Sequence, residues 1–369
     1  MDKWLPNCTS DPSGIDHVLP DPDFHLSEPV IAVELVIAEL RAARDIILYE
    51  GPDFIRVTSV ESLRGTAERL ILSAARLRWL GLEVMQGAAL DVSGLSETQI
   101  LALVCGRARI AVPPLSPASP LELAALELAK LALVLPAIIV SEDNDPNLLR
   151  APVSAIAQYS AQRVAALKLV TRAPVPLEGA QHTEFVVFRG GEGLRDQVAI
   201  VIGAPDFSKP VPVRLHSACL TGDLFGSLKC DCGDQLRSTA KAMAEGLGGI
   251  ILYLDQEGRG TGIGNKMRAY GLQAQGLDTF DADEILGFEH DGRHFAFAAR
   301  MLQLLGVSKV KLMTNNPAKV AALRAAGLEV TETLAIQGRL THQNRGYLTT
   351  KRDRGGHLLD LDLAARIPE

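Results

Sequence analysis

The sequence predicts a two-domain α/β (α+β) protein, and three observations support this prediction. The chain has 369 residues, more than one compact domain usually holds. Hydrophobic residues make up 47% and charged residues 22% of the chain, a balance typical of globular proteins that bury a core. In the second half, segments with strand-like and helix-like patterns alternate, as they do in α/β domains.

Four segments are expected along the chain. Residues 1–30 are rich in Pro, Asp and Ser, a composition that predicts an irregular arm. An α/β domain is predicted over residues 31–150 and a second domain over residues 165–369. The helical pattern of residues 151–164 follows a polar, Pro-containing stretch, so this segment is expected to connect the two domains.

The first domain is predicted to begin with a helix at Ile31 that leads into the strand DIILYEG. Residues 59–81 start at Ser and end at Gly, which predicts a capped helix. A strand followed by a Pro-rich turn is predicted over residues 105–120. A helix from Pro120 then leads to the apolar strand AIIVS.

The second domain is predicted to alternate strands with helices. Asn316 directly precedes Pro317, and this pair predicts the capped start of a helix. The pattern predicts strands over residues 182–191, 197–205, 250–254, 309–314 and 328–334, and helices over residues 235–246, 265–276, 294–306 and 317–327.

The composition argues against several classes of protein. A formal net charge of -7 does not fit a nucleic-acid or membrane-surface binder, whose footprint would be a basic stripe. The first residues lack an apolar signal segment, and no stretch approaches a membrane span. Five cysteines in a chain of this length do not form a disulfide framework. We therefore expect a soluble, cytoplasmic protein with reduced thiols.

Three of the five cysteines cluster in the stretch HSACLTGDLFGSLKCDCGDQ. Thiolates at Cys219, Cys230 and Cys232 would supply three zinc ligands and leave the fourth tetrahedral position for water, as in a catalytic site. Zinc lowers the pKa of a bound water to about 7. Two alternatives stay open: His216 completes a closed structural zinc site, or the cysteines are small buried residues without a metal.

Three further clusters have the composition of anion-binding turns. In EGRGTGIGNKMRAYG, glycines and Lys266 surround the start of a predicted helix, where backbone amides and positive charge attract phosphate. TNNPAK places Thr314 and Lys319 at another strand-to-helix turn, and GFEHDGRHF carries Asp291 and Arg293 before a further helix. Each cluster alone has an ordinary explanation as a loop or a cap. Together they indicate a zinc hydrolase that acts on a phosphorylated substrate.

The motifs of the second domain resemble those of the GTP cyclohydrolase II family in their order and spacing. The resemblance covers about residues 165–360 and rests on RLHSACLTGD, SLKCDCGDQL, QEGRGTGIGNKMRAY, GLDT, LGF, TNNPAKV and GHLL. It implies a GTP cyclohydrolase II-like fold for this domain. It also implies that Cys219, Cys230 and Cys232 are the zinc ligands.

The resemblance implies roles for other residues as well. Tyr270 matches a catalytic tyrosine, Asp291 a proton acceptor, and Arg293 a nucleophile toward the α-phosphorus. Because a guanidinium is protonated at any ordinary pH, the residue chemistry alone favours a phosphate clamp for Arg293. The positions that match nucleotide-holding residues of the family are Arg214, His216, Ser217, Gln235, Glu257, Gly258, Arg259, Thr279, Thr314 and Lys319.

The family's reaction opens the imidazole ring of GTP with water activated by zinc, and releases formate and pyrophosphate. Magnesium helps to hold the triphosphate. The resemblance therefore implies a cyclohydrolase that uses Zn2+ together with Mg2+ beside a nucleoside triphosphate. It also implies a homodimer.

Two departures from the family pattern favour another base. The usual HSEC reads HSAC here, so Ala218 replaces a carboxylate, and Asp255 stands where a basic residue is common. Guanine presents two donors that suit a carboxylate, and leaving buried donors unpaired costs about 1–3 kcal/mol. These changes resemble the uracil-catabolism branch of the family, which implies UTP as the substrate. GTP is the alternative, and a nucleotide-sensing module without turnover is the alternative from another class.

The first domain resembles a degenerate dihydroxybutanone phosphate synthase, an enzyme often fused ahead of GTP cyclohydrolase II. The acidic, magnesium-binding motif of the synthase is absent, and Glu50 and Asp53 are the carboxylates that remain in EGPDFIRVTS. So few acids do not hold a metal. We therefore expect a non-catalytic scaffold that supports dimerisation or covers the active site. Cys105 is interpreted as a small buried residue.

Overall fold

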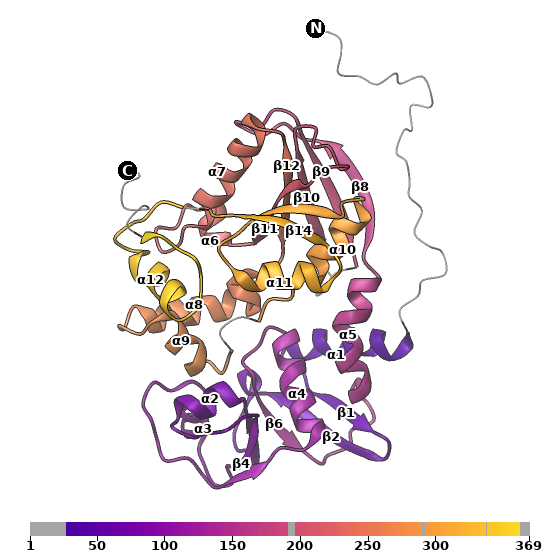
Figure 1. The fold of residues 1–369 in the computed structure, drawn as a ribbon. Coiled ribbons are helices and arrows are strands. Elements are labelled where there is room, and N and C mark those ends of the chain that lie inside the picture. Colours follow the sequence, from indigo (N-terminus) through magenta and orange to yellow (C-terminus); the bar gives the residue numbers. More distant parts are fainter. Residues whose placement is uncertain (1–26, 191–195, 290–291, 337, 362–369) are drawn as a thin grey trace.

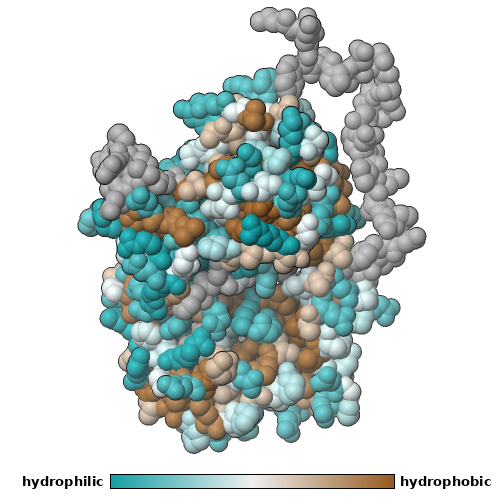
Figure 2. Space-filling model, viewed as in Figure 1, coloured by the Kyte–Doolittle hydropathy of each residue, from teal (hydrophilic) through white to brown (hydrophobic). Residues whose placement is uncertain are grey.

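The computed structural model contains two seven-stranded sheets, one in each half of the chain (Figure 1), so the mixed α/β fold class is confirmed. It describes residues 27–190, 196–289, 292–336 and 338–361. The arm predicted over residues 1–30 lies almost entirely outside the described residues. Hydrophilic and apolar side chains are interspersed over both halves of the face in Figure 2. None of the described helices is long and apolar enough to cross a membrane.

The sheet of the N-terminal half has the spatial order β5-β4-β3-β6-β2-β1-β7. Its strand pairs are antiparallel except for β1 with β7. Its elements are α1 (Glu28–Arg41), β1 (Ile46–Glu50), β2 (Asp53–Ser59), η1 (Val60–Ser62), β3 (Arg69–Leu72), α2 (Ala74–Trp79), β4 (Ala88–Asp91), α3 (Glu97–Cys105), β5 (Leu115–Pro117), α4 (Pro120–Leu131), β6 (Ala137–Ser141), β7 (Arg150–Pro152) and α5 (Val153–Ala165).

The sheet of the C-terminal half has the order β14-β13-β11-β12-β10-β9-β8. Strands β11 to β14 pair in parallel, whereas β8, β9 and β10 pair antiparallel. Its elements are β8 (Lys168–Pro174), β9 (Thr183–Arg189), β10 (Gln197–Ile202), β11 (Val211–Ser217), α6 (Leu220–Asp223), α7 (Cys232–Glu245), β12 (Gly249–Leu254), η3 (Glu257–Gly260), α8 (Gly262–Gln273), α9 (Thr279–Ile285), α10 (Ala296–Leu304), β13 (Lys309–Met313), α11 (Pro317–Ala325), β14 (Glu329–Leu334) and α12 (Arg345–Asp353).

Helices cover both faces of the C-terminal sheet, as Figure 1 shows. Residues of one strand alternate between two cores, because successive side chains point to opposite faces of a sheet. Leu252 of β12 joins Met301 of α10 and Leu323 of α11 on one face. Ile251, the residue before Leu252, joins Met243 of α7 on the other face. The sheet is therefore buried on both sides and opens to solvent at its strand ends.

The core of the N-terminal half continues into the C-terminal half. On one face of its sheet, α1, α4 and α5 enclose a core of its own. On the other face, Leu70 and Leu103 belong to one apolar cluster with Ala269 of α8 and with Ala282 and Phe288 at α9. The two halves are thus joined by buried apolar contacts as well as by the chain.

Most elements predicted for the C-terminal half are confirmed, including the helix that Asn316 caps by accepting a hydrogen bond from the Ala318 backbone at 2.9 Å. The helix predicted over 59–81 is wrong: η1, β3 and α2 occupy this segment. Leu70, Ile71 and Leu72 are fully buried and pair with β4 and β6, so sheet pairing overrides the helical pattern.

The strand predicted at the start of residues 105–120 is also wrong. No strand forms over residues 105–114, and the paired residues are Leu115–Pro117, in the Pro-rich part. This β5 strand lies at the edge of the sheet, where proline is tolerated because one side of the strand needs no hydrogen bonds.

Candidate active site

A cavity of about 380 Å³ lies at the carboxyl ends of the parallel strands β11, β12 and β13. β11 ends at Ser217 and leads directly to Cys219, and β13 ends at Met313 and leads to Thr314. β12 leads into η3, the glycine-rich loop. Ligands of open α/β sheets characteristically bind at such strand ends, and this volume suits a small molecule.

All of the predicted site residues that the structure describes line this one cavity. Asp291, the predicted proton acceptor, lies outside the described residues. Ala218 also lines the cavity, whereas Asp255 does not. The predicted residues in the lining are Arg214, His216, Ser217, Cys219, Cys230, Cys232, Gln235, Glu257, Gly258, Arg259, Tyr270, Thr279, Arg293, Thr314 and Lys319.

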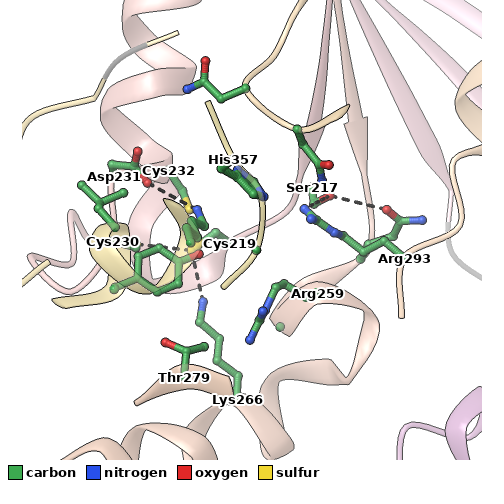
Figure 3. A pocket seen from close by; sticks show the side chains of 18 of the residues that line it. Ser217, Cys219, Cys230, Asp231, Cys232, Arg259, Lys266, Thr279, Arg293 and His357 are labelled. Atoms are coloured by element: carbon green, nitrogen blue, oxygen red, sulfur yellow. Dashed lines mark hydrogen bonds and ion pairs between the residues drawn. The ribbon is translucent and has the colours of Figure 1, made fainter. Parts of the chain in front are cut away.

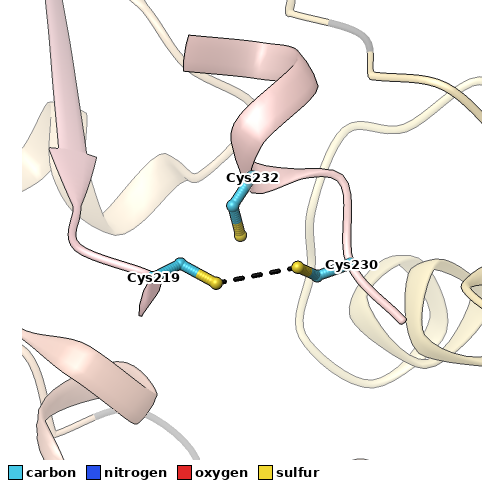
Figure 4. Close-up of side chains that lie close together, drawn as sticks. All are labelled: Cys219, Cys230 and Cys232. Carbon is cyan, nitrogen blue, oxygen red and sulfur yellow. Dashed lines mark hydrogen bonds between the residues drawn. The ribbon is translucent and has the colours of Figure 1, made fainter. Parts of the chain in front are cut away.

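The three cysteines come from two segments and meet at one point (Figure 4). Cys219 precedes α6, while Cys230 and Cys232 flank the start of α7. Their Sγ atoms all lie within 4.8 Å of one another, and those of Cys219 and Cys230 are 3.6 Å apart. Sulfurs bound to one zinc ion at about 2.3 Å each stand about 3.8 Å apart in a tetrahedron. The trio therefore fits three ligands of a zinc ion.

The backbone at Gly222 packs closely against the thiols of Cys219 and Cys230. A Cβ atom added at Gly222 would lie 2.7 Å from Sγ of Cys230 and 3.1 Å from Sγ of Cys219. The short helix α6 therefore approaches the sulfurs as closely as a glycine backbone allows. The motif CLTGD needs its glycine for this approach.

Lys266 supplies positive charge to the trio. Its Nζ lies 3.1 Å from Sγ of Cys219 and 2.7 Å from Oε1 of Glu257. Hydrogen bonds from Cys230 and Cys232, together with the Lys266 ammonium, lower the pKa of Cys219. A lowered pKa favours the thiolate, which is the form that binds a metal.

His216 is held away from the trio by a carboxylate that the sequence did not single out. Its Nε2 lies 3.0 and 3.1 Å from the two oxygens of Asp223, and its ring stacks on Tyr253 with the centroids 5.5 Å apart. The metal-ligand group of the described residues contains only Cys219, Cys230 and Cys232. The arrangement therefore favours an open zinc site over a closed one completed by His216.

The protonation of His216 follows from its burial, which lowers its pKa. The neutral ring then donates from Nε2 to Asp223, because a carboxylate only accepts. Its Nδ1 is buried and has no hydrogen-bond partner among the described residues. Since His216 lines the cavity, Nδ1 is an acceptor that a ligand N–H could satisfy.

The glycine-rich loop has a left-handed turn at its centre. Gly258, Arg259 and Gly260 all have positive φ, at 64°, 61° and 91°. For Arg259 this conformation is uncommon and costs energy, and it is held by an ion pair with Asp283 of α9. A strained, anchored loop at a cavity is typical of a functional site.

The opposite side of the cavity carries Ser217 and Arg293, while the cysteines lie across from them (Figure 3). Nη1 of Arg293 lies 3.5 Å from Oγ of Ser217, and Nζ of the buried Lys319 donates to the Leu215 carbonyl at 2.6 Å. Nη1 of Arg214 donates to the Met313 carbonyl at 3.2 Å. Arg293 and Lys319, which both lie against the Phe295 ring, give this side the charge that a phosphate chain requires. Arg214 also donates to the Gln235 side chain of α7, toward the cysteines.

Two ionisable groups of the lining are strongly affected by burial. Burial lowers the pKa of Arg214 to about 10, so it stays charged at neutral pH. Burial also raises the pKa of Tyr270, and Lys229 lies 4.8 Å from the centroid of its ring. The Tyr270 hydroxyl therefore remains protonated and can donate a hydrogen bond.

The sequence reasoning missed part of the cavity wall. Tyr347, Lys351 and His357 line the cavity from α12 and the turn that follows it. The one available signal was GHLL, a family motif that contains His357. The sequence of α12 did not indicate a buried helix, because only Leu348 among its residues is buried.

Comparisons with known proteins agree with the motifs. The family model described as GTP cyclohydrolase II matches residues 168–335. A protein of Xylella fastidiosa (strain Temecula1) named GTP cyclohydrolase-2 is 43% identical over 355 residues, which cover 91% of this chain and 89% of that protein.

Two other relatives match shorter parts of the chain. The GTP cyclohydrolase-2 of Azospirillum brasilense is 45% identical over 64% of this chain and 64% of its own length. The riboflavin biosynthesis protein RibBA of Bacillus mycoides (strain KBAB4) is 38% identical over 64% of this chain and 64% of its own length.

Proposed function

The chain belongs to the GTP cyclohydrolase II family, and on that premise we propose that it opens the base ring of a nucleoside triphosphate with zinc. Enzymes of this family are hydrolases that act on C–N bonds. The observation that carries the proposal is the convergence of three thiols, within 4.8 Å of one another, at a cavity lined by cationic side chains. Three thiolates leave one zinc position for water, which is the arrangement of a catalytic site.

The residues around the trio have complementary tasks in this proposal. Cys219, Cys230 and Cys232 would hold the zinc ion, which supplies Lewis-acid activation of water when bound. The hydrogen bonds from Cys230 and Cys232, with the Lys266 ammonium at 3.1 Å, favour the thiolate form of Cys219. Tyr270, protonated because burial raises its pKa, would donate a hydrogen bond to the base as negative charge develops on it.

The triphosphate would lie against the cations on the opposite side. Arg293 would bind phosphate oxygens as a clamp, since a guanidinium presents several donors in one plane, and Lys319 would add its charge. We assign Arg293 this role rather than that of a nucleophile. Mg2+ would accompany the triphosphate and neutralise part of its charge, and pyrophosphate would leave from this side.

The substrate is proposed to be GTP. A relative 43% identical over 91% of the chain is named GTP cyclohydrolase-2, whereas the prediction of UTP rests on local changes in sequence. Ala218 lines the cavity where the family pattern has a carboxylate, and this observation keeps UTP as the second candidate. Uracil has a single ring N–H between two carbonyls and needs no carboxylate opposite an amino group.

The test offers GTP and UTP separately to the zinc-loaded protein with magnesium. Loss of base absorbance is followed while formate and pyrophosphate are measured. Consumption of GTP with release of formate supports the proposal, and consumption of UTP alone assigns the activity to the second candidate. Turnover of neither would favour a nucleotide-sensing module.

The variant Ala218→Glu sharpens this test because it restores the family carboxylate. If guanine donors are unpaired in the native site, the variant is expected to raise kcat/KM for GTP relative to UTP by about 10-fold or more. An unchanged ratio would show that residue 218 does not face the base.

A homodimer and a cytoplasmic location are part of the same proposal. Both rest on the resemblance to the family and on composition. Light scattering of the purified protein tests the dimer, and a single-chain mass would contradict it.

A further inference from the structure

One wall of the cavity is formed by a segment that follows the part matched by the family model. Tyr347 and Lys351 line the cavity from α12, and neither is among the residues predicted from the sequence. Arg354 ties this wall to α9, because Nη1 lies 2.9 Å from the carboxylate of Asp281 and also donates to Asp278. Arg354 therefore connects the wall formed by α12 to α9, which also lines the cavity.

Lys351 lies at the metal end of the cavity. Its Nζ lies 3.9 Å from Oδ1 of Asp231, the residue between Cys230 and Cys232. The ammonium also lies 4.2 Å from the centroid of the Tyr347 ring. Its side chain is only 19% exposed, so the charge has lost most of its hydration and needs polar partners.

The carboxylate of Asp231 balances the positive charge of Lys351, but it accepts no hydrogen bond from the Lys351 ammonium. A separation of 3.9 Å is longer than a hydrogen bond, and Oδ1 of Asp231 makes none with the described residues. Oδ2 accepts from the Gln235 amide at 2.5 Å. Burial alone would lower the pKa of Lys351, but Tyr347 and Asp231 raise it. The lysine is therefore charged at neutral pH. Of the three N–H donors of the ammonium, one is directed to the Tyr347 side chain, and the others are available for a ligand.

The base must lie at this same end, because the bond cleaved in the proposed reaction belongs to the base ring. Guanine and uracil carry a carbonyl oxygen where adenine and cytosine carry an amino group. An ammonium only donates, so it pairs with the carbonyl and opposes the amino group. We propose that Lys351 donates a hydrogen bond to the base carbonyl and thereby selects keto bases over amino bases. This inference rests on the proposed function, which sets the base at the metal.

The test compares Lys351→Met with Arg352→Met in the zinc-loaded full chain. Arg352 is the next residue of α12, but it pairs with Asp353 and is 44% exposed. Rapid-mixing measurements, completed before turnover, give Kd for GTP, ATP, UTP and CTP. Loss of a hydrogen bond from a charged donor is expected to raise Kd for GTP and UTP about 10- to 100-fold. Kd for ATP and CTP should not rise, and Arg352→Met should change none of the four.

Lys351→Gln provides a second variant, because an amide both donates and accepts. It should keep part of the binding of GTP and UTP and improve that of ATP and CTP. Zinc content and a melting curve show which variants retain the fold. In either folded variant, the readout is the ratio of Kd for the keto nucleotides GTP and UTP to Kd for the amino nucleotides ATP and CTP. An equal loss for all four nucleotides would mean that Lys351 contacts phosphate, and this result or an unchanged ratio would overturn the inference.

The binding assay separates the two proposals. A wild-type chain that turns over none of the four nucleotides, yet binds keto bases through Lys351, would contradict the proposed function alone. If the wild-type chain turns over GTP but Lys351→Met leaves the ratio of keto to amino Kd values unchanged, only this inference is contradicted.

Discussion

The two halves contain sheets of seven strands each, yet the described residues bring metal ligands together only in the C-terminal half. In the N-terminal half, Glu50 and Asp53 are paired across the β1–β2 hairpin and are exposed, and they belong to no group of three potential metal ligands among the described residues. In the C-terminal half, three cysteines from two segments meet within 4.8 Å. A metal site therefore depends on whether the fold brings its ligand residues together, as it does for the three cysteines.

The N-terminal half contributes support to the helices that carry the site. Leu133, itself at φ 59°, accepts a hydrogen bond from the Asn265 amide of α8 at 3.0 Å and packs against Gly262. Arg76 is fully buried and donates to the Ile285 carbonyl at the end of α9 at 3.2 Å. Because α8 and α9 line the cavity, the geometry of the site depends on this junction.

The largest effect is expected when a cysteine of the C-terminal half is replaced by serine, with a cysteine of the N-terminal half as the control. Cys232→Ser removes a zinc ligand and should lower kcat by about 1,000-fold or more, with loss of bound zinc. Cys105→Ser changes a partly buried thiol of α3 and should leave zinc content and kcat within about 2-fold. Metal analysis and initial rates measure both variants. Full activity of Cys232→Ser would remove the contrast between the halves.

The junction is tested by Arg76→Met. The guanidinium donates to backbone carbonyls of α3 and its end and to Ile285 of α9, and its removal leaves buried acceptors unpaired. The free energy of unfolding should fall by roughly 2–4 kcal/mol, and kcat/KM should fall as α9 moves. Urea unfolding measures the loss.

The matched control for this variant is Arg78→Met, on the same short helix. Arg78 is partly exposed and pairs with the exposed Glu289 at 2.8 Å, so its removal should cost less than about 1 kcal/mol. Equal losses in the two variants would show that the junction has no special role.

A smaller effect is expected from Glu61→Gln. Glu61 pairs with Arg268 of α8 at 3.0 Å and accepts from the Leu135 backbone at 2.7 Å. Partly exposed ion pairs contribute little, so we expect a loss of about 0.5–1 kcal/mol that shrinks at high salt. A loss that is independent of salt would show that packing, not charge, dominates at this point.

The smallest effect is expected from the double variant Glu50→Gln with Asp53→Asn. Both carboxylates are exposed and take part in no metal-ligand group of the described residues. Activity, zinc content and stability should stay at wild-type values within error. A clear fall in activity would give the N-terminal half a chemical role that the contrast between the halves excludes.

The elements that were predicted correctly are those whose hydrophobic pattern agrees with the faces that they bury in the fold. β10 and β12 are apolar runs in a sheet covered on both faces, and β13 alternates lysines with the buried Val310 and Leu312. α10 and α11 carry apolar faces that join the core of this sheet. The cysteine trio was also predictable, because its spacing and chemistry are visible without a fold. These predictions needed only local information.

The elements that failed depend on tertiary contacts. β11 was not predicted, although Val213 and Leu215 alternate with polar residues as in a strand. Arg214 and His216 occupy the polar positions of this pattern, yet both are buried because they line the cavity. α12 is rich in polar and charged residues, and only Leu348 among its residues is buried, so it lacks the apolar face by which the other helices were predicted. Asp223, which fixes His216, sits in a four-residue helix that no pattern of this length can predict. The short α6 and the polar α12 therefore carry functional residues on elements whose own sequences give little indication of structure.

The central claim is that one zinc ion at the cysteine trio makes this cavity a cyclohydrolase. The most direct measurement strips the protein of metal with a chelator and titrates it with Zn2+ while base loss is followed with GTP and, in parallel, with UTP. We predict no turnover in the stripped protein and a linear rise that reaches its plateau at one zinc ion per chain. Turnover without metal, or full zinc binding without turnover of either nucleotide, would contradict the claim.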